Sequence, residues 1–179
     1  MSYYLNETIQ WISIITLIFF CLIMIKRPQF VGGDKTQQLM DHGYPLGSKF
    51  PLSEITSVEG EILCIQKSGN SAQKTLLIIT TSGCSVCENL YPLLNKLKHT
   101  LLNTKVVWCA VGDMDYVKTT IQKNKLDLFV YHMEDIPGKI LGTNRVPFAY
   151  YLNSEGVIQS RNVVNSYEHI INLIGGSSN

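Results

Sequence analysis

The longest uninterrupted apolar stretch of the chain lies near its start. Residues 8–25 carry no charged side chain, and Lys26 and Arg27 end the stretch. A helix of this length spans about 27 Å, which is close to the thickness of the hydrocarbon core of a bilayer. Trp11 lies near one end, where aromatic residues are enriched at the membrane interface. We therefore predict a transmembrane anchor over residues 8–25.

A cleaved signal peptide is the main alternative to an anchor. Signal peptides carry basic residues before their apolar segment, whereas here the basic residues follow it and residues 1–7 contain no Lys or Arg. The pattern therefore favours an uncleaved anchor. Residues 26–47 contain Gly32-Gly33 and Gly43-Tyr44-Pro45, which are typical of a connector that ends in a docking segment.

Beyond residue 48, short apolar runs predict the strands of a sheet. Residues 74–80 and 105–111 are continuous runs rich in apolar and β-branched side chains, as in buried central strands. Asn153-Ser154-Glu155-Gly156 predicts a turn that joins the last two strands as an antiparallel hairpin. The remaining runs predict strands at residues 61–66, 128–131, 146–152 and 157–163.

The segments between these runs show the spacing of amphipathic helices. Residues 84–102 place a stripe of leucines on one face, and Pro92 should kink that helix. The leucines are Leu90, Leu93, Leu94, Leu97 and Leu101. Asn165 should cap a last helix over residues 166–174. Further helices are expected at residues 114–125 and, briefly, at 135–141. The order predicts an α/β domain over residues 48–174, with a central mixed sheet flanked by helices.

A Cys-x-x-Cys pair lies where the strand at residues 74–80 passes into the first helix. Cys84 occupies the helix start and Cys87 lies one turn further in. Unpaired backbone N–H groups and the helix dipole at a helix start favour a thiolate, which is the reactive form of cysteine. The pair therefore indicates a redox-active disulfide in which Cys84 is the nucleophile.

Half of a zinc site is the competing interpretation of this pair. A closed zinc site needs a second pair or histidines at suitable spacing, whereas Cys64 and Cys109 stand apart and the four histidines are scattered. The strand–motif–helix context favours redox chemistry, so we expect no metal. Cys64 and Cys109 lie in strand-like runs, where we expect buried thiols with no part in the chemistry.

Charge narrows the range of partners. The chain has 15 basic and 14 acidic residues, for a net charge of +1, and no cluster of basic residues. Proteins that bind nucleic acids usually carry a basic patch. We therefore do not expect a nucleic acid among the partners.

The features above, in this order, resemble the thioredoxin fold. They are a strand ending at Cys84-Ser85-Val86-Cys87, the helix proline Pro92, the Val146-Pro147 pair that opens a later strand, and the turn with Gly156. The resemblance covers about residues 48–174. The apolar anchor and residues 43–51, Gly-Tyr-Pro-Leu-Gly-Ser-Lys-Phe-Pro, look more narrowly like membrane-anchored thioredoxin-like thiol-disulfide oxidoreductases of the methylamine dehydrogenase accessory and cytochrome c maturation types.

The resemblance implies roles for individual residues. Cys84 would attack the client disulfide and Cys87 would resolve the mixed disulfide. Pro147 would follow a cis peptide bond beside the disulfide, and the backbone of Val146 would bind the client peptide. The family often buries an acid near the pair as a proton acceptor, and Glu61 is the positional candidate. No cofactor is implied.

The sequence departs from the family pattern around the pair. Ser82-Gly83 precede Cys84 where the family often has Trp, and Ser85-Val86 replace the common Gly-Pro between the cysteines. These positions tune the thiol pKa and the reduction potential. The direction of the reaction, as oxidant, reductant or isomerase, therefore stays open.

These features predict a thiol-disulfide oxidoreductase that acts on a protein client carrying a disulfide or dithiol. The alternative is a non-enzymatic membrane-bound maturation or assembly factor that uses the fold as a docking platform. A thiol peroxidase is disfavoured because the resolving Cys87 adjoins Cys84. Lys26 and Arg27 favour a cytosolic domain, whereas the resemblance points to the outer face. We expect the outer face, where a membrane redox partner would reset the pair.

Overall fold

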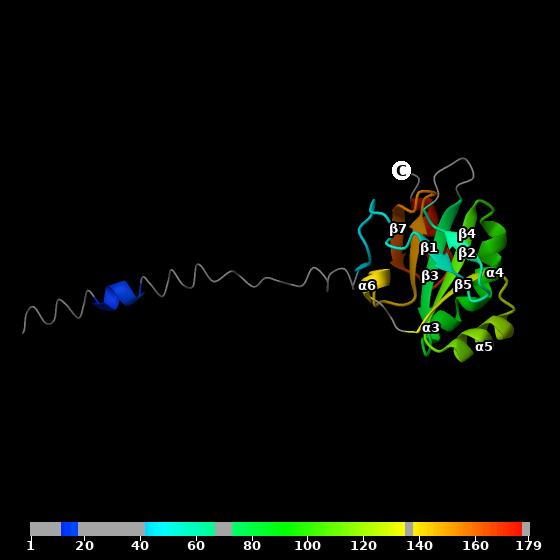
Figure 1. Ribbon diagram of the computed structural model, residues 1–179, viewed down its shortest axis with the longest axis horizontal. Coiled ribbons are helices and arrows are strands. Elements are labelled where there is room, and N and C mark those ends of the chain that lie inside the picture. Colours follow the sequence, from blue (N-terminus) through cyan, green and yellow to red (C-terminus); the bar gives the residue numbers. More distant parts are fainter. Residues whose placement is uncertain (1–11, 18–41, 67–72, 135–137, 177–179) are drawn as a thin grey trace, which may run out of the picture. The chain divides into compact units, whose positions relative to one another are not determined.

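The computed structural model describes residues 12–17, 42–66, 73–134 and 138–176 (Figure 1). The chain divides into two units, residues 1–35 and 36–179. In the first unit, residues 12–17 are helical. The remainder of the predicted anchor at 8–25, and most of the predicted connector at 26–47, lie outside the described residues. Within the described part of the chain, no helix has the length and apolarity needed to cross a membrane.

The second unit is built on a five-stranded mixed sheet with the strand order β5-β4-β3-β6-β7. The central strand β3 pairs in parallel with β4 and antiparallel with β6. β4 pairs in parallel with β5, and β6 pairs antiparallel with β7. The strands are β3 (Lys74–Thr81), β4 (Thr104–Val111), β5 (Phe129–Met133), β6 (Phe148–Leu152) and β7 (Ile158–Val163). The predicted central mixed sheet is therefore confirmed.

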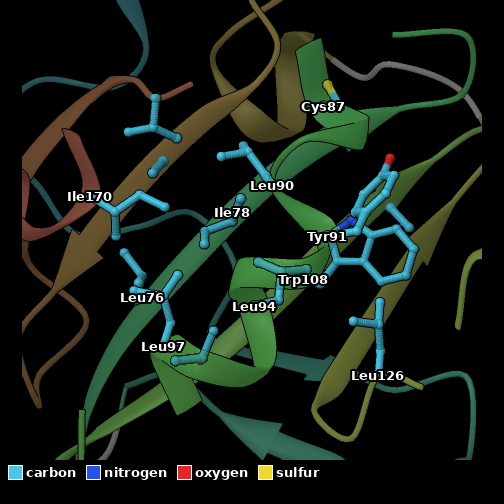
Figure 2. Packing of buried hydrophobic residues seen from close by; sticks show 14 of the residues in the cluster. Leu76, Ile78, Cys87, Leu90, Tyr91, Leu94, Leu97, Trp108, Leu126 and Ile170 are labelled. Carbon is cyan, nitrogen blue, oxygen red and sulfur yellow. The ribbon is translucent and has the colours of Figure 1, made fainter. Parts of the chain in front are cut away.

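Helices connect these strands and cover one face of the sheet. The buried cluster on that face combines side chains of β3, β4 and β6 with residues of the three longer helices α4, α5 and α7. Figure 2 shows Leu76 and Ile78 of β3 beside Leu94 and Leu97 of α4. The helices are α3 (Ser85–Glu88), α4 (Tyr91–Thr100), α5 (Met114–Asn124), α6 (Gly138–Leu141) and α7 (Tyr167–Gly175).

The opposite face of the sheet is covered mainly by segments that precede β3. Phe50, Ile55 and Ile65 pack there against Leu77 and Tyr150 of the sheet. Ile55 belongs to a small antiparallel sheet of β1 (Glu54–Thr56) and β2 (Ile62–Cys64). The central strands are buried on both faces, which explains why β3 and β4 have continuous apolar runs rather than alternating ones.

Residues 43–50 form a docking segment along the edge strand β7. Gly47 N donates to Ile158 O at 2.9 Å, and Ile158 N donates to Ser48 O at 2.9 Å. Phe50 N donates to Gly156 O at 2.8 Å. These backbone bonds cover part of the sheet edge, and one of them is made by Gly47, the last residue of the predicted connector. The docked residues include 43–47, which precede the predicted domain start at residue 48.

Two predicted helix boundaries are corrected by the structure, and one strand was not predicted. The predicted helix at 84–102 is two helices, because α3 ends at Glu88 and α4 begins at Tyr91. Pro92 therefore lies in the first turn of α4, where its missing N–H costs no helical hydrogen bond, and it does not kink a continuous helix. Ser166, rather than Asn165, caps α7 through its hydroxyl, which accepts from His169 N at 3.2 Å. Strand β1 has no counterpart among the predicted strands.

Candidate active site

Cys84 and Cys87 form a disulfide at the junction of β3 and α3, with Cα atoms 5.3 Å apart. Cys84 is the N-cap of α3, and its Sγ accepts a hydrogen bond from Cys87 N at 3.2 Å. Cys84 is half-buried, whereas Cys87 is fully buried. In the reduced protein the same N–H group would stabilise a thiolate on Cys84. The pairing predicted from the sequence is confirmed, and of the two cysteines only Cys84 is partly exposed to solvent.

A tight turn carries the chain from the central strand to Cys84. Ser82 N donates to Val111 O at 3.0 Å, which extends the pairing of β3 and β4 by one residue. Gly83 then adopts a φ of +74°, a conformation that glycine reaches without steric cost. The Ser82-Gly83 departure from the family pattern therefore serves the turn that presents Cys84 at the end of the sheet.

Val146 and Pro147 lie at the same end of the sheet as the disulfide. Their peptide bond is cis, as expected from the resemblance. β3 and β6 run antiparallel with Ile79 opposite Phe148, so the residues before Phe148 lie beside the end of β3 that leads to Cys84. Pro147 is buried, and Val146 and Cys84 are both partly buried and pack against the cluster that contains Cys87. The fold thus brings together four of the five predicted site residues.

Glu61 is the exception, and its prediction as proton acceptor is wrong. Its side chain is 59% exposed, and its Oε1 lies 3.4 Å from Lys105 Nζ. Lys105 pairs with Thr75 at the start of β3, whereas the disulfide follows the end of that strand at Thr81. A strand of this length separates the two ends by roughly 20 Å. Glu61 directly precedes β2. It therefore lies at the end of the domain opposite to the disulfide.

No carboxylate replaces Glu61 in the described core. Among the described residues, the buried polar side chains other than tyrosine and tryptophan are all threonines, namely Thr75, Thr80, Thr104, Thr120 and Thr143. Carboxylates are rarely buried without a partner because desolvation penalises their charge. A buried acid in contact with the pair is therefore not part of the described site.

A chain of hydroxyl groups borders the same buried cluster that contains Cys87. Trp108 Nε1 donates to Thr80 Oγ1 at 2.8 Å, and Thr80 Oγ1 lies 3.3 Å from the Tyr91 hydroxyl. The Tyr91 hydroxyl in turn lies 3.0 Å from that of Tyr116 in α5. Tyr91, Trp108 and Cys87 belong to one buried cluster (Figure 2). These contacts fix the start of α4, four positions after Cys87, to β3, β4 and α5.

The sequence pattern alone does not predict this hydroxyl chain. Burial raises the pKa of Tyr91 well above its ordinary value, so this side chain stays a neutral phenol and cannot serve as a base. Its role is to satisfy the buried Trp108 and Thr80 groups. Thr80, a polar residue at the end of an otherwise apolar run, is the one signal that could have indicated it.

The two remaining described cysteines differ from each other. Cys109 is buried in β4, as predicted, and burial raises the pKa of its thiol. Cys64 is exposed, so its predicted burial is wrong. It lies on β2, whose two-stranded sheet leaves that side chain uncovered. Within the described ranges, no group of three or more His, Cys, Asp or Glu residues could hold a metal ion.

Comparison with known proteins relates this chain to a group of curated relatives. No protein-family model matches the chain. It is 24% identical over 135 residues to methylamine utilization protein MauD of Methylobacillus flagellatus, covering 75% of this chain and 65% of that protein. It is 26% identical over 136 residues to MauD of Methylorubrum extorquens, covering 76% and 66%. The aligned part thus spans just under two-thirds of either relative.

Solved structures show the same architecture. The thioredoxin domain of a thiol-disulfide oxidoreductase from Bacteroides vulgatus matches with a TM-score of 0.61 at 16% identity, covering 76% of this chain and 99% of that domain. A DsbE-type thiol:disulfide interchange protein from Chlorobium tepidum matches with a TM-score of 0.62 at 14% identity, covering 77% and 98%. The chain has the thioredoxin fold and is similar in sequence to the MauD proteins. Its thioredoxin-like domain carries the Cys84–Cys87 pair at the end of the central strand.

Proposed function

We propose that this protein is a membrane-anchored thiol-disulfide oxidoreductase that exchanges disulfides with protein clients through Cys84 and Cys87. The observation that carries the proposal is the difference in burial between the two cysteine residues. Cys84 is half-buried and Cys87 is fully buried, beside the cis Val146-Pro147 bond. This arrangement supports attack by Cys84 on an outside disulfide and an internal step by Cys87.

The reaction proceeds in two exchange steps. The Cys84 thiolate attacks one sulfur of the client disulfide, which forms a mixed disulfide and releases the other client sulfur as a thiolate. Cys87 then attacks Cys84 Sγ, which forms the Cys84–Cys87 disulfide. The second client sulfur leaves as a thiolate and takes up the proton that Cys87 gives up. The client is reduced by two electrons and the protein is oxidised by two.

The backbone around Val146 would hold the client in an extended conformation. Val146 precedes β6 at the same end of the sheet as Cys84, and an extended peptide can add to such backbone as a short strand. Main-chain hydrogen bonds of this kind do not depend on the client's side chains. We therefore expect a broad tolerance for client sequence near the disulfide.

A trapping experiment tests the proposed roles of the two cysteines. In the full-length protein, Cys84→Ser should abolish exchange with a protein disulfide such as that of insulin. Cys87→Ser should accumulate a mixed disulfide that non-reducing electrophoresis detects, because the second step is removed. Cys64→Ser serves as the matched control and should exchange like the original protein. Accumulation of the mixed disulfide in Cys84→Ser rather than in Cys87→Ser would reverse the assignment.

The anchor and the side of the membrane belong to the same proposal. The uncharged residues 8–25 support a single-pass anchor, with the domain on the outer face of the membrane, where disulfides persist in exported proteins. An outward domain cannot draw on the cytosolic thiol pool. The proposal therefore includes a membrane redox partner that resets the Cys84–Cys87 pair.

A maturation or assembly factor without turnover is the second candidate. It is favoured by the name of the relatives, which connects them with methylamine utilization. Such a factor would hold its client tightly and react once for each client molecule. Multiple-turnover kinetics with a regenerating reductant would support the oxidoreductase, whereas a single burst with a retained client would support the factor.

A further inference from the structure

The loop at residues 142–147 leads from α6 to β6 and ends in the cis Val146-Pro147 bond. We call it the site loop. Gly142, Thr143 and Pro147 are buried, whereas Asn144 and Arg145 are exposed. Thr143 Oγ1 accepts from Arg145 N at 3.1 Å, which is one bond within the loop. What fixes the two ends of this loop therefore decides where Val146 lies relative to Cys84.

The first end of the site loop is held by a hydroxyl bridge to the docking segment. The Tyr150 hydroxyl donates to Leu141 O at 2.7 Å and accepts from Tyr44 N at 3.0 Å. One buried oxygen thus joins the last residue of α6 to the chain at Tyr44. Burial raises the pKa of Tyr150 to about 12, so the hydroxyl remains a neutral donor over the pH range of thiol exchange.

The ring of Tyr44 lies directly against the first residue of the site loop. A Cβ atom added to Gly142 would come within 2.7 Å of Tyr44 Cδ2 and Cε2. Gly142 also has a φ of +68°, which disfavours any side chain there. The contact between backbone and ring is therefore close because residue 142 is glycine.

The second end of the site loop enters the same aromatic group. Phe148 follows Pro147, and its ring centroid lies 5.0 Å from that of Tyr150. Phe50 of the docking segment packs on Tyr150 at 5.4 Å and lies 6.3 Å from Tyr44, both in edge contacts. Aromatic pairs in this geometry stabilise one another beyond their burial alone. The first end of the loop thus contacts the docking segment directly, and the second end is linked to it through Tyr150.

Arg161 secures the docking segment where it meets these rings. Arg161 belongs to the edge strand β7, and its Nη1 donates to Gly43 O of the docking segment. A Cβ atom at Gly43 would meet the Tyr150 hydroxyl at 2.4 Å, so the chain passes the bridging oxygen at close range. The docking segment is therefore held by contacts of its own and can act as a rigid support.

We propose that Tyr44 is a positioning residue for client exchange, through which the docking segment sets the position of the site loop and hence of the Val146 backbone beside Cys84. This inference rests on the proposed function. Tyr44 touches neither sulfur, so it should affect the binding of an extended client on the loop and not the reactivity of the pair. A small disulfide that needs only access to Cys84 should be insensitive to it.

The test compares two disulfides in the full-length reduced protein in detergent, in a Cys21→Ser, Cys64→Ser background, so that the exposed Cys64 thiol does not consume the small disulfide. Insulin is the protein disulfide, and 5,5′-dithiobis(2-nitrobenzoate) is the small one. For Tyr44→Ala, the ratio of the insulin rate to the small-disulfide rate should fall about tenfold, because a modest displacement of a binding element is enough to slow a reaction. The fall should appear chiefly as a raised KM for insulin. Using the ratio cancels any loss of folded protein.

Three further variants keep the inference falsifiable. Tyr44→Phe retains the ring on Gly142 and the backbone hydrogen bond to Tyr150, so its ratio should equal that of the original protein. Tyr150→Phe removes the bridging hydroxyl and should lower the ratio as Tyr44→Ala does. Tyr167→Ala is the matched control, because Tyr167 lies at the start of α7, with its ring against Lys96 at 4.2 Å, and its ratio should stay unchanged.

The outcomes separate this inference from the proposed function. An unchanged ratio in Tyr44→Ala, or an equal fall for both disulfides, would overturn the positioning role while leaving the oxidoreductase in place. Failure of the original protein to exchange with insulin, although it reacts with the small disulfide, would overturn the proposed function on protein clients. A ratio that falls in Tyr167→Ala as well would show a general effect of lost packing and would also overturn the inference.

Discussion

Cys84 and Cys87 differ in their surroundings more than their spacing suggests. Only three positions separate them, yet Cys84 is half-buried and Cys87 is fully buried against Leu90 and Tyr91. Burial in apolar surroundings raises a thiol pKa, whereas a hydrogen bond from a backbone N–H lowers it. The reduced pair should therefore ionise first at Cys84, which receives the N–H of Cys87.

The exposed position of Glu61 predicts that its charge has no part in disulfide exchange. Glu61→Gln should leave the rate of insulin reduction within about twofold of the original and leave its pH profile unchanged, because the carboxylate is solvated and pairs with Lys105 far from the disulfide. Stability should change by less than about 0.5 kcal/mol, as is usual for exposed ion pairs. A shifted pH profile with intact folding would show that Glu61 reaches the pair after all.

Residue roles could be predicted where the signal is local. Cys84 and Cys87 follow from their spacing after an apolar run, and the cis bond before Pro147 from the resemblance. The predictions for Glu61 and Cys64 failed because they depend on which end and which face of the domain the three-residue strand β2 occupies. Such a short strand has too few residues for its alternation to identify the buried side. The sequence pattern also does not predict its pairing partner β1.

At the scale of elements, the break between α3 and α4 places Cys87 in its own short helix. α3 has four residues, and Leu90 N donates to Cys87 O at 3.0 Å to close its last turn. The sequence pattern could predict the buried stripe, since Leu90, Leu94 and Leu97 are all fully buried. It could not place the break, because Asn89 and Leu90 keep the helical spacing while the chain leaves the helix.

The position of Pro92 makes this boundary testable. Pro92→Ala should change the free energy of unfolding by less than about 1 kcal/mol, since a proline in the first helical turn breaks no helical hydrogen bond. Leu94→Ala in the same helix is the control for sensitivity and should cost about 2–5 kcal/mol, because Leu94 is fully buried. Denaturant titration of both variants measures the difference.

A gain of more than about 2 kcal/mol in Pro92→Ala would contradict this boundary. It would mean that the proline interrupts a continuous helix, as the sequence pattern had predicted, and that its removal restores the missing hydrogen bond. The exchange rate of Pro92→Ala should also match the original, because α3 and the cap at Cys84 are formed without Pro92.

At the scale of the whole molecule, the exchange site lies at one end of the sheet and a cavity lies at the other. The cavity has a volume of about 320 Å³ and is lined by Glu61, Lys98 and Lys105, among other residues. Lys105 marks the start of β4, whereas the disulfide adjoins the end of β3. The end that carries the disulfide presents Val86, which is 44% exposed between the cysteines. An exposed apolar side chain between the cysteines supports the proposed protein client.

The side of the membrane is the remaining prediction at this scale, and Cys64 offers a direct reporter of it. Cys64 is exposed on the domain surface, Cys109 is buried, and Cys84 and Cys87 are paired. A thiol reagent should therefore label Cys64 in the folded, oxidised domain without prior reduction. A Cys21→Ser background removes the cysteine of the predicted anchor from the measurement.

A membrane-impermeant maleimide applied to intact cells should label Cys64 if the domain faces outward, as we propose. Lys26 and Arg27 favour the opposite side, but two basic residues are a weak determinant of orientation that other features override. The labelled peptide is identified by mass spectrometry, with Cys64→Ser as the control for specificity. Labelling of Cys64 only after lysis would place the domain in the cytosol. A cytosolic thioredoxin-like domain would draw electrons from the soluble thiol pool, whereas an outward domain needs the proposed membrane redox partner, so the same measurement identifies the class of electron source.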